Sequence, residues 1–329
     1  MAYKKLNTQL FSAWNTYAIS MMSVLEDCDM WNKEYTFQKF MGVTGIAAQF
    51  VIDTHCSALP ITDYDWQAEH PRFLQRIGVR TSIYHATPDD LAYDHKQGQA
   101  IRAVKQALNQ NRAVVVWGID TGEFGIIVGF DDEDSVFFAK GIGSINTNGS
   151  MPVLYKNLGK TFSGAPVLYA EIPDSFQPID WKQAYFHSLR LYAHEMTRVS
   201  DRADRAYGID GYDLLISCLK NDSCDSFGLR YCMGVYYERK DAMLLYLREI
   251  RDTFSNSEID DIINEFEQVV ELYRQLLFDV LAQGTDGWNQ LWHEVNRGKY
   301  SEIIQIVEKI KEEEMKVVNI INHLVSCED

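Results

Sequence analysis

The chain has 329 residues, of which 46% are hydrophobic and 24% charged, a composition that excludes a disordered protein. Its length predicts two domains. The formal net charge of −16 opposes binding to nucleic acid and to anionic membrane surfaces. Because the sequence shows neither signal-peptide features nor an apolar run of membrane-spanning length, we expect a cytoplasmic protein.

The first half of the chain mixes helical and strand patterns. Apolar residues recur at steps of three and four from Phe11 to Cys28, which predicts a helix. Further on, a turn at Asp131–Asp134 joins two apolar segments into a hairpin, and Pro173 closes the last strand. We expect helices over 11–28, 70–77 and 98–112, and strands over 79–84, 113–120, 124–130, 136–140 and 165–173. This arrangement predicts an α+β domain with an antiparallel sheet.

After Pro178 the apolar residues recur only with the helical period, and no strand pattern follows. Ser257 and Asp260 have the spacing of a capping box at the start of one of them. We expect helices over 180–203, 210–220, 228–254, 256–284 and 300–325. The chain therefore divides into an α+β domain at 1–176 and an all-α helical bundle at 177–329.

The order of elements in the first half, with AVVVWGIDTGEFGIIVGFDDED at 113–134, resembles the papain-like fold of cysteine peptidases that process bacteriocin leaders. The whole chain is similar to a narrower group, the acyltransferases like the butirosin-biosynthesis protein H. In that group the papain-like domain precedes a helical region with a Gly-x-x-x-Tyr segment and a helix ending in Phe-Leu-x-Glu-Ile. This chain has GIDGYDLLISCLK at 208–220 and YYERKDAMLLYLREI at 236–250 in those places.

The resemblance assigns family positions to residues of this chain. Gln9 takes the position of the oxyanion-hole glutamine, and Asn15, six residues later, takes that of the nucleophilic cysteine. Glu123 takes the position of the histidine, and Lys140 that of the acid that orients it. Cysteine chemistry requires a thiolate beside an imidazole. As aligned, this chain is therefore not a cysteine peptidase.

Glu123 has two interpretations, and both stay open. It is either a general acid or base in a half-buried cleft, or a carboxylate that pairs with Lys140 across the hairpin. Thr44 lies in MGVTG at 41–45, which either cradles an anion through its backbone amides or forms a tight turn that feeds the next element, and which can line the cleft in both cases. We assign substrate contacts to residues around these positions: Trp14, Thr16, Thr44, Trp117 and Lys140.

Cys56 is the alternative nucleophile, because it directly follows His55. Neighbouring side chains of a strand point apart, so His55 activates Cys56 only if the loop turns there. The six cysteines of the chain form no C-x-x-C pair, which favours reduced thiols over disulfides. A packed, inert cysteine is the simpler interpretation.

The resemblance implies a biosynthetic protein that passes an acyl group from a thioester, held by a carrier protein or a small molecule, to an amine. Such a reaction needs positioning, an oxyanion donor such as Gln9 and a general base such as Glu123. Two alternatives remain: a non-catalytic module that binds a peptide or small molecule, and a cysteine hydrolase that uses Cys56. We expect neither cofactor nor metal, and a homo-oligomer is compatible with the sequence.

Overall fold

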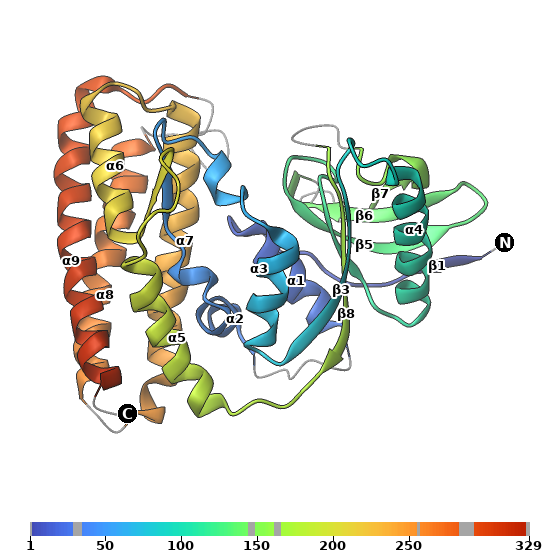
Figure 1. The fold of residues 1–329 in the computed structure, drawn as a ribbon, viewed down its shortest axis with the longest axis horizontal. Helices are drawn as coiled ribbons and strands as arrows, with labels where there is room; N and C mark the ends of the chain where they lie inside the picture. Colours follow the sequence, from blue (N-terminus) through green and yellow to red (C-terminus); the bar gives the residue numbers. More distant parts are fainter. Residues whose placement is uncertain are drawn as a thin grey trace. The chain divides into compact units, whose positions relative to one another are not determined.

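The computed structural model describes residues 2–28, 35–143, 149–160, 166–254, 257–282 and 293–326. These residues form a mixed α+β structure, which confirms the predicted fold class at that level (Figure 1). The chain divides into two compact units. The first, here called the sheet unit, comprises Met1–Phe40 and Gln67–Ile179. The second, the helical unit, comprises Met41–Trp66 and Asp180–Asp329.

The helical unit therefore contains a segment from the first half of the chain, 41–66, as well as everything after residue 179. Strand β2 (Val51–Asp53) explains this, because it pairs antiparallel with β9 (Arg205–Tyr207). The hydroxyl of Tyr236 also accepts a hydrogen bond from the Val51 backbone N–H (3.0 Å). Pairing over such a sequence distance leaves no local pattern, so the predicted boundary at 176/177 places this segment in the other domain.

The sheet unit is built on a seven-stranded sheet in which every neighbouring pair is antiparallel. The strand order is β3-β8-β4-β5-β6-β7, and β1 pairs with β5. The strands are β1 Tyr3–Lys5, β3 Val79–Ala86, β4 Val114–Trp117, β5 Phe124–Asp131, β6 Val136–Gly141, β7 Met151–Leu154 and β8 Leu168–Phe176. Strand β4, with the sequence VVVW, is buried throughout, as expected for the centre of a sheet covered on both faces.

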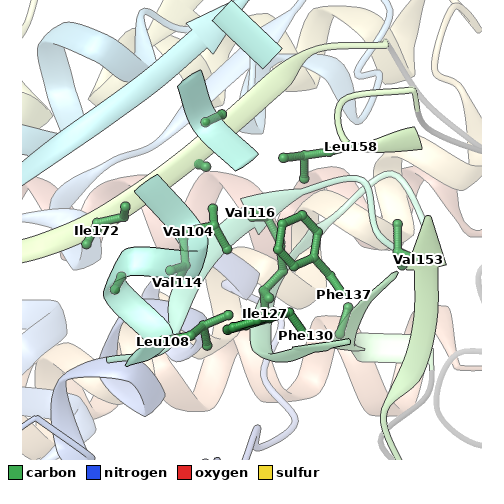
Figure 2. Packing of buried hydrophobic residues seen from close by; sticks show 14 of the residues in the cluster. Val104, Leu108, Val114, Val116, Ile127, Phe130, Phe137, Val153, Leu158 and Ile172 are labelled. Carbon is green, nitrogen blue, oxygen red and sulfur yellow. The ribbon is translucent and has the colours of Figure 1, made fainter. Parts of the chain in front are cut away.

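Helices cover both faces of this sheet (Figure 1). On one face, α4 (Tyr93–Asn109) contributes Val104 and Leu108 to a core that also contains Val116 and Phe137 (Figure 2). On the other lies α1 (Thr16–Glu26), whose residues from Thr16 to Leu25 are all buried. A helix buried all round is held by packing on every side, which fixes the position of its first residue.

Several boundaries in the sheet unit differ from the predicted ones, among them the start of α4 at Tyr93 rather than residue 98 and the end of β4 at Trp117 rather than residue 120. Two further differences have a visible cause. Helix α1 begins at Thr16 rather than Phe11, whose side chain is 52% exposed. The backbone before α1 follows the sheet instead, since Leu6 N–H donates to the Val128 carbonyl (2.7 Å). Strand β8 also continues three residues past Pro173, which lies opposite Thr81 beside a register shift in β3. An irregularity of this kind accommodates a residue without a backbone N–H.

The helices after residue 180 follow the predicted order and approximate positions, although α5 ends at Met196 rather than at residue 203. They are α5 Trp181–Met196, α6 Gly208–Lys220, α7 Ser226–Ile250, α8 Glu258–Arg274 and α9 Tyr300–Ser326, and the shorter α2 and α3 earlier in the chain span Phe37–Thr44 and Trp66–Gln75. Ser257 precedes α8 but makes no side-chain capping bond. The predicted helix end at Gly284 lies outside the described residues. Within the part of the chain described, no helix is long and apolar enough to cross a membrane.

The helical unit encloses a network of polar side chains with no exposed surface. Lys240 of α7 forms an ion pair with Glu314 of α9 (Nζ to Oε1, 2.7 Å), and both side chains are 0% exposed. Tyr192 of α5 donates to Oε2 of Glu314 (2.5 Å) and accepts a hydrogen bond from Lys240 (2.8 Å). Tyr212 of α6 and Tyr273 of α8 share a hydrogen bond beside them (2.8 Å). One buried charge pair thus connects the side chains of these helices.

Candidate functional site

Thr16, the first residue of α1, contacts Glu123, the residue before β5. The Thr16 hydroxyl donates a hydrogen bond to Oε2 of Glu123 (2.7 Å). The same hydroxyl accepts one from the Phe124 backbone N–H (3.3 Å). Because Thr16 is held from the β5 side and itself holds the carboxylate, this oxygen of Glu123 has a fixed position.

Local structure on both sides explains why these residues meet. Asn15 is the N-cap of α1, and its carbonyl accepts the first helical hydrogen bond, from Ile19 N–H (3.1 Å). The loop between β4 and β5 is closed by a hydrogen bond from Gly118 N–H to the Glu123 carbonyl (2.8 Å). Gly118 has a φ of 69°, which a glycine adopts without strain. The loop therefore places Glu123 next to Gly118, the residue that follows the end of β4.

The solvent exposure of Asn15, Thr16 and Glu123 indicates which of them can contact a substrate. Thr16 and Asn15 are 4% and 6% exposed, whereas Glu123 is half-buried. A threonine with so little surface is poorly placed to attack a substrate, but well placed to orient the neighbouring carboxylate. Glu123 is thus the residue of the three that can both reach solvent and accept a proton.

The other residues assigned to this site by sequence occupy varied settings. Trp117, at the end of β4, is buried and packs edge-on against Phe124 (ring centroids 4.9 Å apart). Trp14 is half-buried, directly before the N-cap of α1. Gln9 is exposed, and its side-chain amide donates to the Asn7 carbonyl (2.9 Å). In this structure the amide group of Gln9 is therefore directed at its own loop.

Lys140 does not make the expected pair across the hairpin. Its ammonium donates to the Thr8 carbonyl (2.7 Å), and in β6 it lies opposite Ile126. Glu123 precedes Phe124, the first residue of β5, and therefore does not lie opposite Lys140 in the pairing of β5 with β6. Burial lowers the pKa of Lys140, and the nearby Lys5 acts in the same direction. The Glu123 carboxylate accepts a hydrogen bond from Thr16, which the sequence places only among the substrate contacts.

Thr44 and Cys56 belong to the helical unit, not to the sheet unit that contains Glu123. Thr44 is the last residue of α2 and is fully buried, with its hydroxyl donating to the Met41 carbonyl (3.4 Å). Gly45 follows with a φ of 82°, the left-handed conformation that commonly ends a helix. The MGVTG segment is thus a helix end and a turn.

Cys56 is a packed thiol. Its side chain is 0% exposed. Hydrogen bonds to Cys224 and Cys232, followed by burial, raise the pKa of Cys56 well above its usual range. His55 is exposed, and its Nδ1 contacts the Thr54 hydroxyl (3.2 Å). A protonated, buried thiol is a poor nucleophile, so these observations disfavour Cys56 as a catalytic residue.

A buried histidine–carboxylate pair in the sheet unit escaped the sequence analysis. His70 of α3 lies 3.5 Å from Glu171 of β8, both 0% exposed. Tyr169 donates to the same carboxylate oxygen (2.6 Å), and Thr81 of β3 donates to the other (2.8 Å). Tyr17 of α1 stacks on the His70 ring (centroids 3.5 Å apart). A glutamate inside the apolar run 165–173 is the sequence signal that could have revealed it.

Burial lowers the pKa of His70, although the nearby Glu171 acts in the opposite direction. The ring is therefore neutral near pH 7 and needs no counter-charge. With no exposed surface, the pair cannot meet a substrate. Hydrogen bonds from Tyr17 of α1 and Thr81 of β3 to Glu171, and between His70 of α3 and Tyr169 of β8, instead hold these elements together. They fix the position of Tyr17, the residue after Thr16.

Comparisons with protein-family models and with curated proteins gave no match. Among the residues that the structure describes, no group of three or more His, Cys, Asp or Glu side chains has an arrangement able to hold a metal ion. The chemistry of the site is therefore inferred from the geometry of its own side chains.

Proposed function

We propose that this protein transfers an acyl group from a thioester to an amine, with Glu123 as the general base. The observation that carries the proposal is the 2.7 Å hydrogen bond from Thr16 to the Glu123 carboxylate. It joins the start of α1 to the start of β5. These are the two places at which a papain-like domain, which we propose the sheet unit to be, holds its nucleophile and its proton acceptor.

The reaction needs no nucleophile from the protein, because a thioester is already activated. The amine nitrogen attacks the thioester carbonyl carbon, and Glu123 accepts the proton that the nitrogen loses. The carbon–sulfur bond then breaks, and the proton passes from Glu123 to the departing thiolate. Asn15, which has no basic or nucleophilic atom, is compatible with this route but not with a covalent intermediate.

The end of α1 offers further support for the negative charge that develops on the carbonyl oxygen. The first backbone N–H groups of a helix lack partners within it and carry a partial positive charge. Helix α1 begins at Thr16, so its N-terminus lies at the hydroxyl that holds Glu123. A carbonyl oxygen bound there would be stabilised as its charge grows.

The test is a turnover assay on the full chain with an amine and with two forms of the acyl donor, a free thioester and one bound to a carrier protein. We expect amide formation with release of one thiol per amide, detected by mass spectrometry and a thiol reagent. A Cys56→Ala variant should retain this activity, because Cys56 is buried and outside the sheet unit.

Two outcomes would contradict the proposal. Saturable binding of a peptide or thioester without turnover of either donor would indicate a binding module. Loss of turnover in a folded Cys56→Ala variant would instead indicate a cysteine hydrolase. Thermal unfolding of the variant, compared with the unchanged chain, distinguishes that loss from simple misfolding.

A further inference from the structure

Each residue of the Thr16–Glu123 contact is followed by an aromatic residue that packs on His70. Tyr17 follows Thr16 and stacks on the His70 ring (centroids 3.5 Å apart). Phe124 follows Glu123 and contacts the same ring edge-on (5.5 Å), and the rings of Tyr17 and Phe124 also pack on each other (5.3 Å). All of these residues belong to the sheet unit. One buried ring therefore contacts the chain neighbour of both Thr16 and Glu123.

Tyr17 is also held at its hydroxyl. This group donates to Oε2 of Glu171 (3.1 Å), an oxygen that accepts a second hydrogen bond from Tyr169 (2.6 Å). Thr81 donates to the other oxygen of the carboxylate (2.8 Å). Glu171 is 0% exposed, so three hydroxyl groups do for its charge what water does at a surface. Removing one of them would leave a buried oxygen less satisfied, and the network therefore resists rearrangement.

The hydrogen bonds of Tyr169 determine which nitrogen of His70 carries the proton. The Tyr169 oxygen lies 2.6 Å from Nδ1 of His70 and 2.6 Å from Oε2 of Glu171. A tyrosine hydroxyl has one hydrogen, and a carboxylate has none. Tyr169 therefore donates to Glu171 and accepts from His70, since the opposite arrangement would leave two oxygens 2.6 Å apart without a hydrogen between them. Because the ring is neutral near pH 7, Nε2 carries no hydrogen.

We propose that His70 is a positioning residue for the Thr16–Glu123 pair, and that it acts by donating its Nδ1 hydrogen to Tyr169. This hydrogen bond directs the Tyr169 hydroxyl at the buried carboxylate, which in turn holds the hydroxyl of Tyr17. Tyr17 is the second residue of α1, so its position fixes that of Thr16. With no exposed surface, His70 acts without touching substrate. This role rests on the proposed acyl transfer, because Glu123 is the base of that reaction.

Two substitutions of His70 separate its hydrogen bond from its volume. Asparagine and leucine have similar shapes and both remove the ring, but only the asparagine amide can donate to Tyr169. With a thioester and an amine as substrates, His70→Leu should lower kcat by about ten-fold, the effect of one buried hydrogen bond, and change KM by less than about two-fold. His70→Asn should retain kcat within about three-fold. Equal losses in the two variants would show that His70 only fills space.

Tyr17→Phe tests the next contact, because it removes only the hydroxyl that donates to Glu171. We expect kcat to fall by about ten-fold in the unchanged chain, and by less than about two-fold beside Glu123→Gln, where no base remains to be positioned. Tyr155→Phe is the matched control. It removes a hydroxyl that donates to the carbonyl of Asp131 (3.0 Å), at the end of β5, and should leave kcat unaltered.

Two measurements on the full chain do not depend on turnover. In NMR spectra of isotope-labelled protein at pH 7, His70 should show the neutral form with its hydrogen on Nδ1. The amide hydrogen of Phe124, which donates to Thr16 (3.3 Å), should exchange at least about five-fold faster in Tyr17→Phe and in His70→Leu than in the unchanged chain. The midpoint of thermal unfolding, measured for each variant, identifies any that is simply unfolded.

The proposal would be overturned by a His70 ring with its hydrogen on Nε2, or by exchange of the Phe124 amide that is the same in every variant. A loss of kcat in Tyr17→Phe that persists beside Glu123→Gln would show that Tyr17 acts on the fold and not on the base. If the unchanged chain turns over no thioester, the acyl-transfer proposal fails. The position of the His70 hydrogen and the exchange of the Phe124 amide then still decide whether the network positions Thr16.

Discussion

Replacing Lys240 by methionine should lower the free energy of unfolding of the helical unit by about 3–5 kcal/mol. The substitution removes one member of an ion pair in which both side chains are 0% exposed, and leaves Glu314 buried without its counter-charge. Burial lowers the pKa of Lys240, and the Glu314 carboxylate acts in the opposite direction. Urea denaturation followed by circular dichroism measures the loss.

Removing both charges should restore much of the lost stability. In Lys240→Met with Glu314→Leu no charge remains in this network, and a well-packed apolar pair is often as stable as the ion pair it replaces. Lys316→Met is the matched control on α9, because Lys316 is 55% exposed and pairs with Glu313 at the surface. A single Lys240→Met variant as stable as this control would contradict the account of the network.

Replacing Glu123 by glutamine should lower kcat for thioester aminolysis by about 10²- to 10⁴-fold. Glutamine preserves the shape of the side chain, and its carbonyl oxygen can accept the hydrogen bond from Thr16. It cannot accept the proton of the attacking amine. KM and the midpoint of thermal unfolding should therefore change little, and steady-state kinetics with either acyl donor measures the effect.

Glu133→Gln provides the control for this variant, because Glu133 is exposed in the turn between β5 and β6. The same chemical change there should leave kcat unaltered. Should Glu123→Gln retain full turnover, Glu123 would be part of the architecture alone. A fall in kcat that only tracks a lower unfolding midpoint would lead to the same conclusion.

The sequence predicted the helices of the second half because their apolar residues repeat with the helical period over long segments. It also predicted the hairpin of β5 and β6, whose turn at Asp131–Asp134 is strongly polar. The pairing of β2 with β9 was not predictable, since a three-residue strand carries no period of its own. Segment 41–66 was assigned to the sheet domain for that reason.

The site was predictable only in part. Glu123 stood out through the family resemblance, but its partner depended on where α1 begins, and a helix start at Phe11 would hide the role of Thr16. Lys240 lies on a largely apolar helix face, a pattern that could have indicated a buried partner for its charge.

A double-mutant cycle on Thr16 and Glu123 tests the central claim most directly. Thr16→Val keeps the shape of the side chain and removes the hydroxyl that holds the Glu123 carboxylate. Alone, it should lower kcat by about 10- to 100-fold, the equivalent of one hydrogen bond to a charged group. In the Glu123→Gln background the same change should lower kcat by less than about three-fold, because residues that act as a unit are not additive. Equal losses in both backgrounds, or no loss in either, would show that Thr16 does not act through Glu123.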